Sequence, residues 1–181
     1  HLGQAGLNTP NNKLLLEKPF GTDLASARAM IEHAATYFGE SQVYRIDHYL
    51  AKEMAQNIVT FRARNAIFSY LWSNQFIEKI EVIALEKIGI EGRATFYEQT
   101  GALRDIVQGH LMQLLALTLL PLDPEDDLNW NSLPTRRQAA LDNIVPADPA
   151  RSLRAQYEGY RDEVDNPSSN TETFVSLELR S

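Results

Sequence analysis

Three clusters of polar residues could carry chemistry in this sequence, and the densest is RIDHYLAKE, Arg45–Glu53. His48, Tyr49 and Lys52 offer an imidazole, a phenol and an ammonium beside the backbone N–H groups of a starting helix. This combination suits a phosphate, because a helix N-terminus and side-chain donors then act on one anion. The structural alternative is that Tyr49 packs, Lys52 is solvated and Asp47 caps the helix.

The second cluster is EKPFG, Glu17–Gly21, at the end of a strand-like run. A Lys18-Pro19 pair at a strand-to-helix junction places an ammonium in the crevice where α/β sheets bind ligands. The alternative is a surface lysine followed by a rigid turn.

The third cluster contains EKIGIEGR, which begins at Glu86, and RDIVQGH, which holds Asp105 and His110. On an α-helix, residues five apart are separated by about 140° and about 7.5 Å. Asp105 and His110 could then border one cleft without touching. A lone histidine near an apolar stripe is more often a packed residue than a catalyst, and geometry decides for any candidate base.

The elements that position the first two clusters alternate between strand and helix. Lys13–Glu17 is a short apolar run typical of a parallel sheet. Thr22-Asp23 is a plausible N-cap for a helix that ends near Gly39. Gln42–Ile46 predicts a second strand, and a further helix begins near Ala51.

The middle and end of the chain show more strand patterns. Phe76–Leu85 alternates, and Arg93–Gln99 predicts its partner strand. A long helix is expected from about Ala102 to Leu120, and the remaining expected elements are a short helix (135–144) and two strands (153–157 and 171–179). The fold class is therefore α+β, with an antiparallel sheet that carries helices on one face.

Composition narrows the function classes. The net charge of −7 argues against general affinity for nucleic acid or an anionic membrane. There is no cysteine, which excludes disulfides and thiolate metal sites. The longest apolar stretch, Leu111–Leu120, is far short of a bilayer span. The chain begins at His1, so we expect a piece of a longer protein, with a cytoplasmic location as the default.

The motifs together resemble the glucose-6-phosphate dehydrogenase family. The resemblance rests on EKPFG, RIDHYLAKEMAQN, EGR and TGALRDIVQGHLMQ, in family order, and returns in RAQYEGYRDE and SNTETFVSLELR. It implies that residues 1–40 are the last strand and helix of a Rossmann-like dinucleotide-binding domain that is otherwise missing. Residues 41–181 would be an incomplete C-terminal substrate-binding and dimerisation domain.

The resemblance also implies a reaction. Family members oxidise β-D-glucose 6-phosphate at C1 to 6-phosphogluconolactone, in the pentose phosphate pathway, and pass a hydride to NADP⁺ or, in some members, NAD⁺. By this likeness His110 is the general base and Asp47 the carboxylate that pairs with it. Lys18 lies where substrate and cofactor meet, and Pro19 shapes the backbone beside the nicotinamide.

The remaining implied roles concern the substrate and assembly. His48, Tyr49 and Lys52 would bind the phosphate, and Glu86 and Asp105 would accept hydrogen bonds from sugar hydroxyls. No metal is implied, and a homodimer or homotetramer formed through the sheet is expected.

Departures from the family pattern set further expectations. Ala51 stands where the family usually has glycine, which would strain the backbone only if φ is positive there. Gly109 replaces a common asparagine. No Gly-rich dinucleotide turn is present, so we expect no dehydrogenase activity from this chain alone, and we expect exposed apolar surface.

Two alternatives remain. Other sugar oxidoreductases share the strand-ending EKP but lack DHYLxKE. A non-catalytic assembly or regulatory relative is opposed by the presence of Asp47, Lys52, Asp105 and His110 together.

Overall fold

The computed structural model describes residues 2–21, 23–122 and 129–181, and the chain divides into two compact units, His1–His48 and Tyr49–Ser181. The family resemblance implies a boundary after residue 40, whereas the compact units divide after His48. The reason is that strand β2 (Val43–Ile46) pairs with strand β1 (Leu14–Glu17) and so belongs to the first unit.

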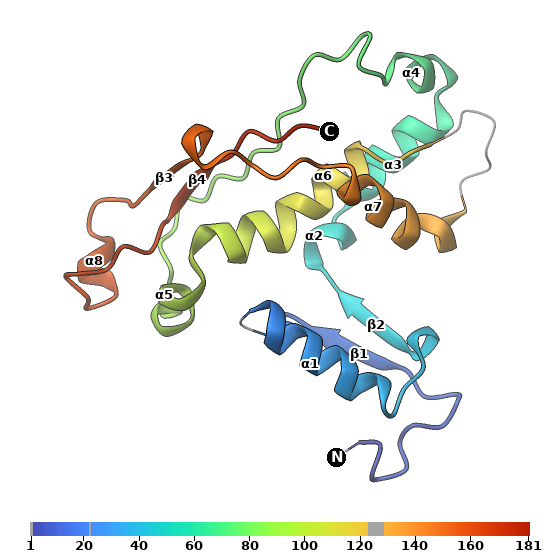
Figure 1. The fold of residues 1–181 in the computed structure, drawn as a ribbon, viewed down its shortest axis with the longest axis horizontal. Coiled ribbons are helices and arrows are strands. Elements are labelled where there is room, and N and C mark those ends of the chain that lie inside the picture. Colours follow the sequence, from blue (N-terminus) through green and yellow to red (C-terminus); the bar gives the residue numbers. More distant parts are fainter. Residues whose placement is uncertain (1, 22, 123–128) are drawn as a thin grey trace. The chain divides into compact units, whose positions relative to one another are not determined.

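The first unit is a strand–helix–strand arrangement (Figure 1). The two strands are parallel, in register from Leu14 opposite Val43 to Glu17 opposite Ile46. The parallel character expected for Lys13–Glu17 is confirmed, but β1 is not the last strand, because β2 follows and pairs with it. Helix α1 (Leu24–Ala35) connects them. Asp23 is its N-cap, as predicted, while Thr22 lies outside the described residues.

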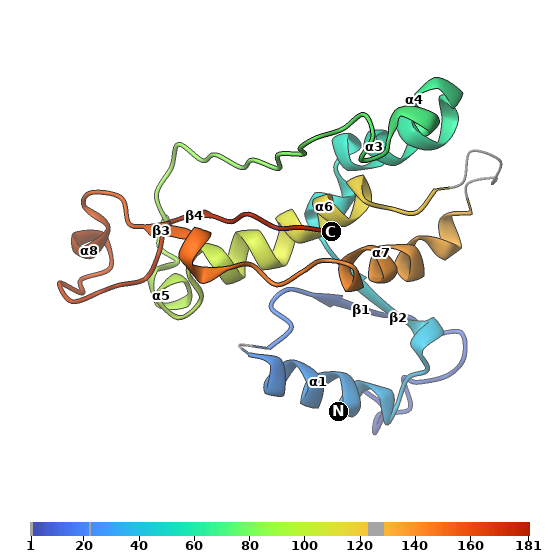
Figure 2. The same cartoon turned by 45° about the horizontal axis from the view of Figure 1, so that its top comes forward.

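The second unit is mostly helical. Helix α2 (His48–Ala51) begins at the last residue of the first unit and continues into the second, where α3 (Glu53–Arg64) and α4 (Ala66–Leu71) follow. A helical run then follows, through α5 (Ala94–Ala102), the π-helical segment η2 (Leu103–Leu111) and α6 (Met112–Thr118), and Figure 2 shows η2 and α6 as one rod. The later elements are α7 (Leu133–Asp142), β3 (Leu153–Ala155), α8 (Tyr160–Glu163) and β4 (Phe174–Ser176).

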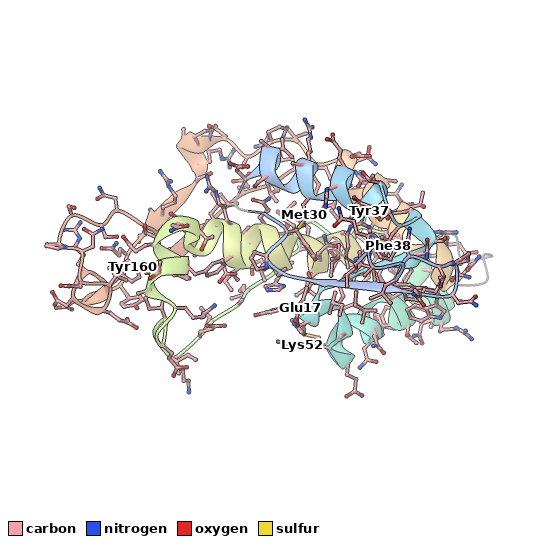
Figure 3. The ribbon with its side chains drawn as sticks, turned by 90° about the horizontal axis from the view of Figure 1, so that it is seen from below. Glu17, Met30, Tyr37, Phe38, Lys52 and Tyr160 are labelled. Atoms are coloured by element: carbon pink, nitrogen blue, oxygen red, sulfur yellow. The ribbon has the colours of Figure 1, made fainter. Side chains whose placement is uncertain are left out.

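Two apolar clusters stabilise this unit. The larger joins α3 to α6 through Ala55, Val59, Leu114, Leu117 and Leu120. The smaller gathers around Tyr160, which is fully buried and labelled in Figure 3, with Ile90, Tyr97 and Ala102.

The strands predicted in the middle of the chain are wrong. Arg93–Gln99 is not a strand, because Arg93 is the N-cap of α5. Its exposed residues Thr95 and Gln99 recur at helical spacing, and its apolar face lies on the smaller cluster. Without that partner, Phe76–Leu85 has no ladder, and its residues from Ile77 onward are irregular.

The expected antiparallel sheet is accordingly small. Within the described residues it consists of β3 and β4 alone, paired from Leu153 opposite Ser176 to Ala155 opposite Phe174. The predicted helices at 102–120 and 135–144 are confirmed in position, as η2 with α6 and as α7.

Exposed apolar surface is confirmed in the second unit. Ile67, Tyr70, Ile83 and Leu85 are each 70–85% exposed. No helix in the part of the chain that the structure describes is long and apolar enough to cross a membrane.

Candidate functional site

The carboxyl ends of β1 and β2 bring two of the sequence clusters together in the first unit. Parallel strands end at the same sheet edge, where open α/β sheets bind ligands. Here His48 Nε2 lies 2.8 Å from Glu17 Oε1, and both side chains are more than half exposed. Lys18 follows Glu17, so the EKPFG lysine and the DHYL histidine share this edge. Figure 3 labels Glu17 on β1.

The nearby residues Pro19 and Asp47 complete this edge. Pro19 follows a cis peptide bond after Lys18, and Asp47 is a half-buried residue directly after β2. The pairing of Asp47 with His110 stays a prediction, since the two residues belong to different units.

The fit of a nicotinamide dinucleotide can be tested at α1. A helix N-terminus can bind a pyrophosphate through its free N–H groups. In α1 the Asp23 carboxylate takes that place and accepts from Ser26 N–H at 2.7 Å. The N-terminus of α1 is therefore already capped by a carboxylate and is not a ready pyrophosphate site. The roles of Lys18 and Pro19 beside a nicotinamide stay predictions.

Tyr49, His110 and Lys52 form a chain of contacts in the second unit. The Tyr49 and His110 rings stack, with centroids 4.2 Å apart and planes at 19°. Lys52 Nζ lies 3.9 Å from the Tyr49 ring centroid, which is a cation–π contact. The structure thus brings together the DHYLAKE and RDIVQGH motifs. Tyr49 also contacts the larger apolar cluster, so its packing role and its place in the site coexist.

Lys52 begins α3 as its N-cap residue and is exposed (Figure 3). Ala51, just before it, ends the helical turn α2. An alanine adopts that right-handed backbone without strain, so the replacement of glycine is mild.

Asp105 and His110 both lie in the π-helical segment η2. In a π-helix each N–H bonds to the carbonyl five residues earlier, so residues five apart lie roughly one turn apart on the same side. The separation expected from α-helical geometry is therefore wrong, and the two residues share a side of the rod. π-helical turns are rare in proteins overall, but those that occur are often found at functional sites.

Asp105 is buried beside groups that the sequence did not single out. Its Oδ2 lies 3.4 Å from Arg93 Nη1, in an ion pair. Tyr97 is also buried, and this burial, with the charges of Asp105 and Glu172, raises its pKa to about 12. The charge of exposed Glu86 acts on the same hydroxyl in the same direction. The charges of the two predicted sugar-binding acids therefore both act on the hydroxyl of one tyrosine.

Arg93 belongs to the EGR motif, so the sequence pointed to Arg93 itself, but it did not indicate that Arg93 pairs with Asp105. Tyr97 was assigned to a strand, and nothing in the sequence pattern connects Glu172 with Asp105.

The far end of the same helical rod is held by donors from α3 and the turn after α4. Arg62 Nη1 and Nη2 donate to the carbonyl oxygens of Leu117 at 2.9 Å and Leu120 at 2.8 Å. Trp72 Nε1 donates to Thr118 O at 2.8 Å. Burial lowers the pKa of Arg62 to about 10, which leaves the guanidinium protonated near neutrality.

Within the described residues no group of three or more His, Asp or Glu side chains is arranged to hold a metal ion.

Comparison with known proteins identifies the family to which this fold belongs. The NAD binding domain of glucose-6-phosphate dehydrogenase matches residues 1–57, and the C-terminal domain of the same enzyme matches residues 59–181. A two-part oxidoreductase, with a dinucleotide-binding part and a second part, is therefore the class to which the fold corresponds. The chain belongs to the glucose-6-phosphate dehydrogenase family.

Individual relatives support this assignment. Glucose-6-phosphate 1-dehydrogenase of Bacillus subtilis is 42% identical over 93% of this chain, and that of Gluconobacter oxydans is 37% identical over 98%. The crystal structure of the Mycobacterium avium enzyme matches 98% of the chain, with a TM-score of 0.87 and 34% identity. A structure of glucose-6-phosphate dehydrogenase in complex with its substrate glucose-6-phosphate matches 99%, with a TM-score of 0.88 and 31% identity.

The chain spans 37% and 38% of the length of these two curated relatives, and 40% and 39% of the two solved chains.

Proposed function

We propose that this chain contributes the substrate site of a glucose-6-phosphate dehydrogenase, which oxidises β-D-glucose 6-phosphate to 6-phosphogluconolactone. The observation that supports it is the stack of His110 on Tyr49, with Lys52 on the same tyrosine. A candidate base and two candidate phosphate ligands, drawn from distant motifs, thus lie together in one compact unit.

The phosphate would be bound by donors of different kinds. Lys52 supplies an exposed ammonium that the Tyr49 ring orients, and Tyr49 itself supplies a hydroxyl. His48 is held by Glu17 at the edge of the parallel strands and supplies a further donor. Charge-assisted hydrogen bonds of this kind are the strong ones for phosphate oxygens.

The sugar would be oriented by acids and deprotonated by the imidazole. Asp105 and Glu86 accept hydrogen bonds from sugar hydroxyls, which fixes the direction in which C1 points. His110 takes the proton of the C1 hydroxyl as the hydride leaves C1. Asp47, two residues before Tyr49 in the sequence, stabilises the imidazolium that forms.

A bound nicotinamide dinucleotide, NADP⁺ or NAD⁺, would accept the hydride. Lys18 and Pro19 are the residues of this chain that would lie beside its nicotinamide. A homodimer or homotetramer of the longer protein is part of the same proposal.

The test uses the full-length protein that carries this chain. We expect glucose 6-phosphate-dependent reduction of NADP⁺ or NAD⁺, and His110→Asn should lower kcat by about 10²–10⁴-fold. His33→Asn, which changes an exposed histidine on α1, is the matched control and should leave kcat unchanged. Residues 1–181 alone should show no turnover.

A non-catalytic relative makes a different prediction. It would bind glucose 6-phosphate or a partner without turnover, and His110→Asn would then change nothing measurable. Absence of turnover in the wild-type full-length protein would therefore refute the proposed function.

A further inference from the structure

The helical rod that carries Asp105 and His110 begins at a glycine. Gly101 has φ 65° and ψ 174°, which is non-helical backbone, and it separates α5 from the rod. The rod therefore starts at Ala102 and runs to Thr118. A residue at this N-cap position normally uses its side-chain oxygen to accept one of the first helical N–H groups. Glycine has no side chain to do so.

Glu172, distant in the sequence, supplies the missing acceptors. Its backbone carbonyl accepts from Ala102 N–H at 2.9 Å, and its Oε1 accepts from Leu103 N–H at 3.0 Å. A carboxylate at a helix N-terminus also interacts favourably with the helix dipole. One glutamate thus satisfies two of the four orphan donors at this end.

The space at Gly101 is matched to that carboxylate. A Cβ at this buried glycine would lie 2.5 Å from Glu172 Oε1 and 2.7 Å from its Cδ. The Glu172 side chain therefore occupies the place that an N-cap side chain would take. The glycine and the distant glutamate act together as one cap.

Hydrogen bonds on both sides hold Glu172 in place. Thr171 Oγ1 donates to the Glu98 carbonyl of α5 at 3.0 Å, and Thr173 N–H donates to the carbonyl of Ala155 on β3 at 2.9 Å. Both views show the β3–β4 hairpin beside the start of the rod (Figures 1 and 2). The residues on both sides of Glu172 are therefore tied to α5 and to β3.

We propose that Glu172 is a positioning residue for substrate binding: its cap fixes the first turn of the rod and, with it, the buried carboxylate of Asp105. This role rests on the proposed function. Because Asp105 lies in the first turn and His110 lies further along, loss of the cap should disturb sugar binding more than proton transfer.

The experiment compares three variants of the full-length protein. Glu172→Ala removes the side-chain acceptor, whereas Glu172→Gln keeps an oxygen at the Oε1 position. Glu158→Ala changes an exposed glutamate of the same hairpin and is the control. Two readouts are needed: KM and kcat for glucose 6-phosphate, and hydrogen exchange of the Ala102 and Leu103 amides.

For Glu172→Ala we expect KM to rise about five- to tenfold with little change in kcat. The Leu103 amide, which loses its side-chain acceptor, should exchange about tenfold faster, whereas the Ala102 amide keeps the backbone carbonyl of residue 172 and serves as the internal reference. Glu172→Gln should restore KM to within about twofold of the wild type, because a neutral acceptor still caps. Glu158→Ala should match the wild type in both readouts.

Unchanged exchange of the Leu103 amide in Glu172→Ala would overturn the cap. Faster exchange with an unchanged KM would overturn the positioning role while leaving the cap. A wild-type protein without turnover would instead refute the proposed function and the positioning role together, and the exchange data alone would still decide the cap.

Discussion

The two ends of the helical rod, Ala102 and Thr118, are held by opposite chemistry. At the start, Glu172 offers acceptors to free N–H groups, and at the end Arg62 and Trp72 offer donors to free carbonyl groups. Both arrangements follow from the orphan backbone groups at helix termini and from the dipole they create. None of these three residues is close in sequence to the helix end that it caps. The rod therefore depends on tertiary structure at both ends.

The two ends also differ in their surroundings. Arg62 is 6% exposed and lies beside the larger apolar cluster, where its Nε has no hydrogen-bond partner among the described residues. At the other end Glu172 is only half-buried, and its charge acts on Tyr97 together with the charge of Asp105. We infer that the Thr118 end mainly supports stability, whereas the Ala102 end mainly supports the candidate site.

The largest effect on stability is expected at Arg62. Arg62→Leu leaves two buried carbonyls without their donors, which should lower the free energy of unfolding by about 3 kcal/mol. Urea unfolding measures this change. Arg64→Leu, at an exposed arginine that ends the same helix, is the control and should change stability by less than about 0.5 kcal/mol. Equal effects of the two variants would contradict the difference between the ends.

A smaller loss is expected at Gly101. Gly101→Ala combines a positive φ with contact against Glu172, and should lower the free energy of unfolding by about 2 kcal/mol. Gly92→Ala is a matched control, because Gly92 has φ +79° but no atom of the described residues lies within 4 Å of an added Cβ. The excess at Gly101 measures the contact with the carboxylate.

A double-mutant cycle separates these contributions. Glu172→Ala in the Gly101→Ala background should recover part of the loss, since the clashing side chain is gone. Strictly additive effects would show that the glycine and the glutamate do not act as one cap.

The sequence predicted this rod but not what holds it. Its apolar stripe has helical spacing, and that local pattern was enough to place a helix from about Ala102 to Leu120. The π-helical backbone of η2 leaves no comparable pattern, so the relation of Asp105 to His110 came only from the structure. Glu172 was invisible for the same reason, because a cap supplied from another element has no fixed spacing.

The error at Arg93–Gln99 has a related cause. Short alternating runs fit a strand or a helix, and tertiary contacts decide between them. Tyr97 lies against Tyr160 in the smaller apolar cluster, which fixes a helical face. By contrast, Lys18 and His48 were predicted to lie near strand ends from local pattern, and β1 and β2 do end there.

The smallest expected effect is a dependence of stability on acidic pH. It should be seen at Glu98, which is bonded to the segment between β3 and β4, but not at Arg62. Hydrogen bonds from Ser169, and further ones from Asn166 and Tyr160, lower the pKa of Glu98 below its usual value of 4.5. A lowered carboxyl pKa contributes stability above the unfolded value, and that stability is lost as pH falls through the folded value. Because Glu98 is only half-buried, solvent screens this interaction and the contribution should stay below about 1 kcal/mol.

Thermal unfolding of the wild type and of Glu98→Gln, measured between about pH 6 and pH 3, tests this expectation. The variant should be less stable at pH 6, and the difference should shrink as the wild-type carboxylate becomes protonated. Arg62 does not titrate in this range, so the difference between the wild type and Arg62→Leu should stay constant. A Glu98→Gln difference that is independent of pH would show that the hydrogen bonds to Glu98 do not depend on its charge.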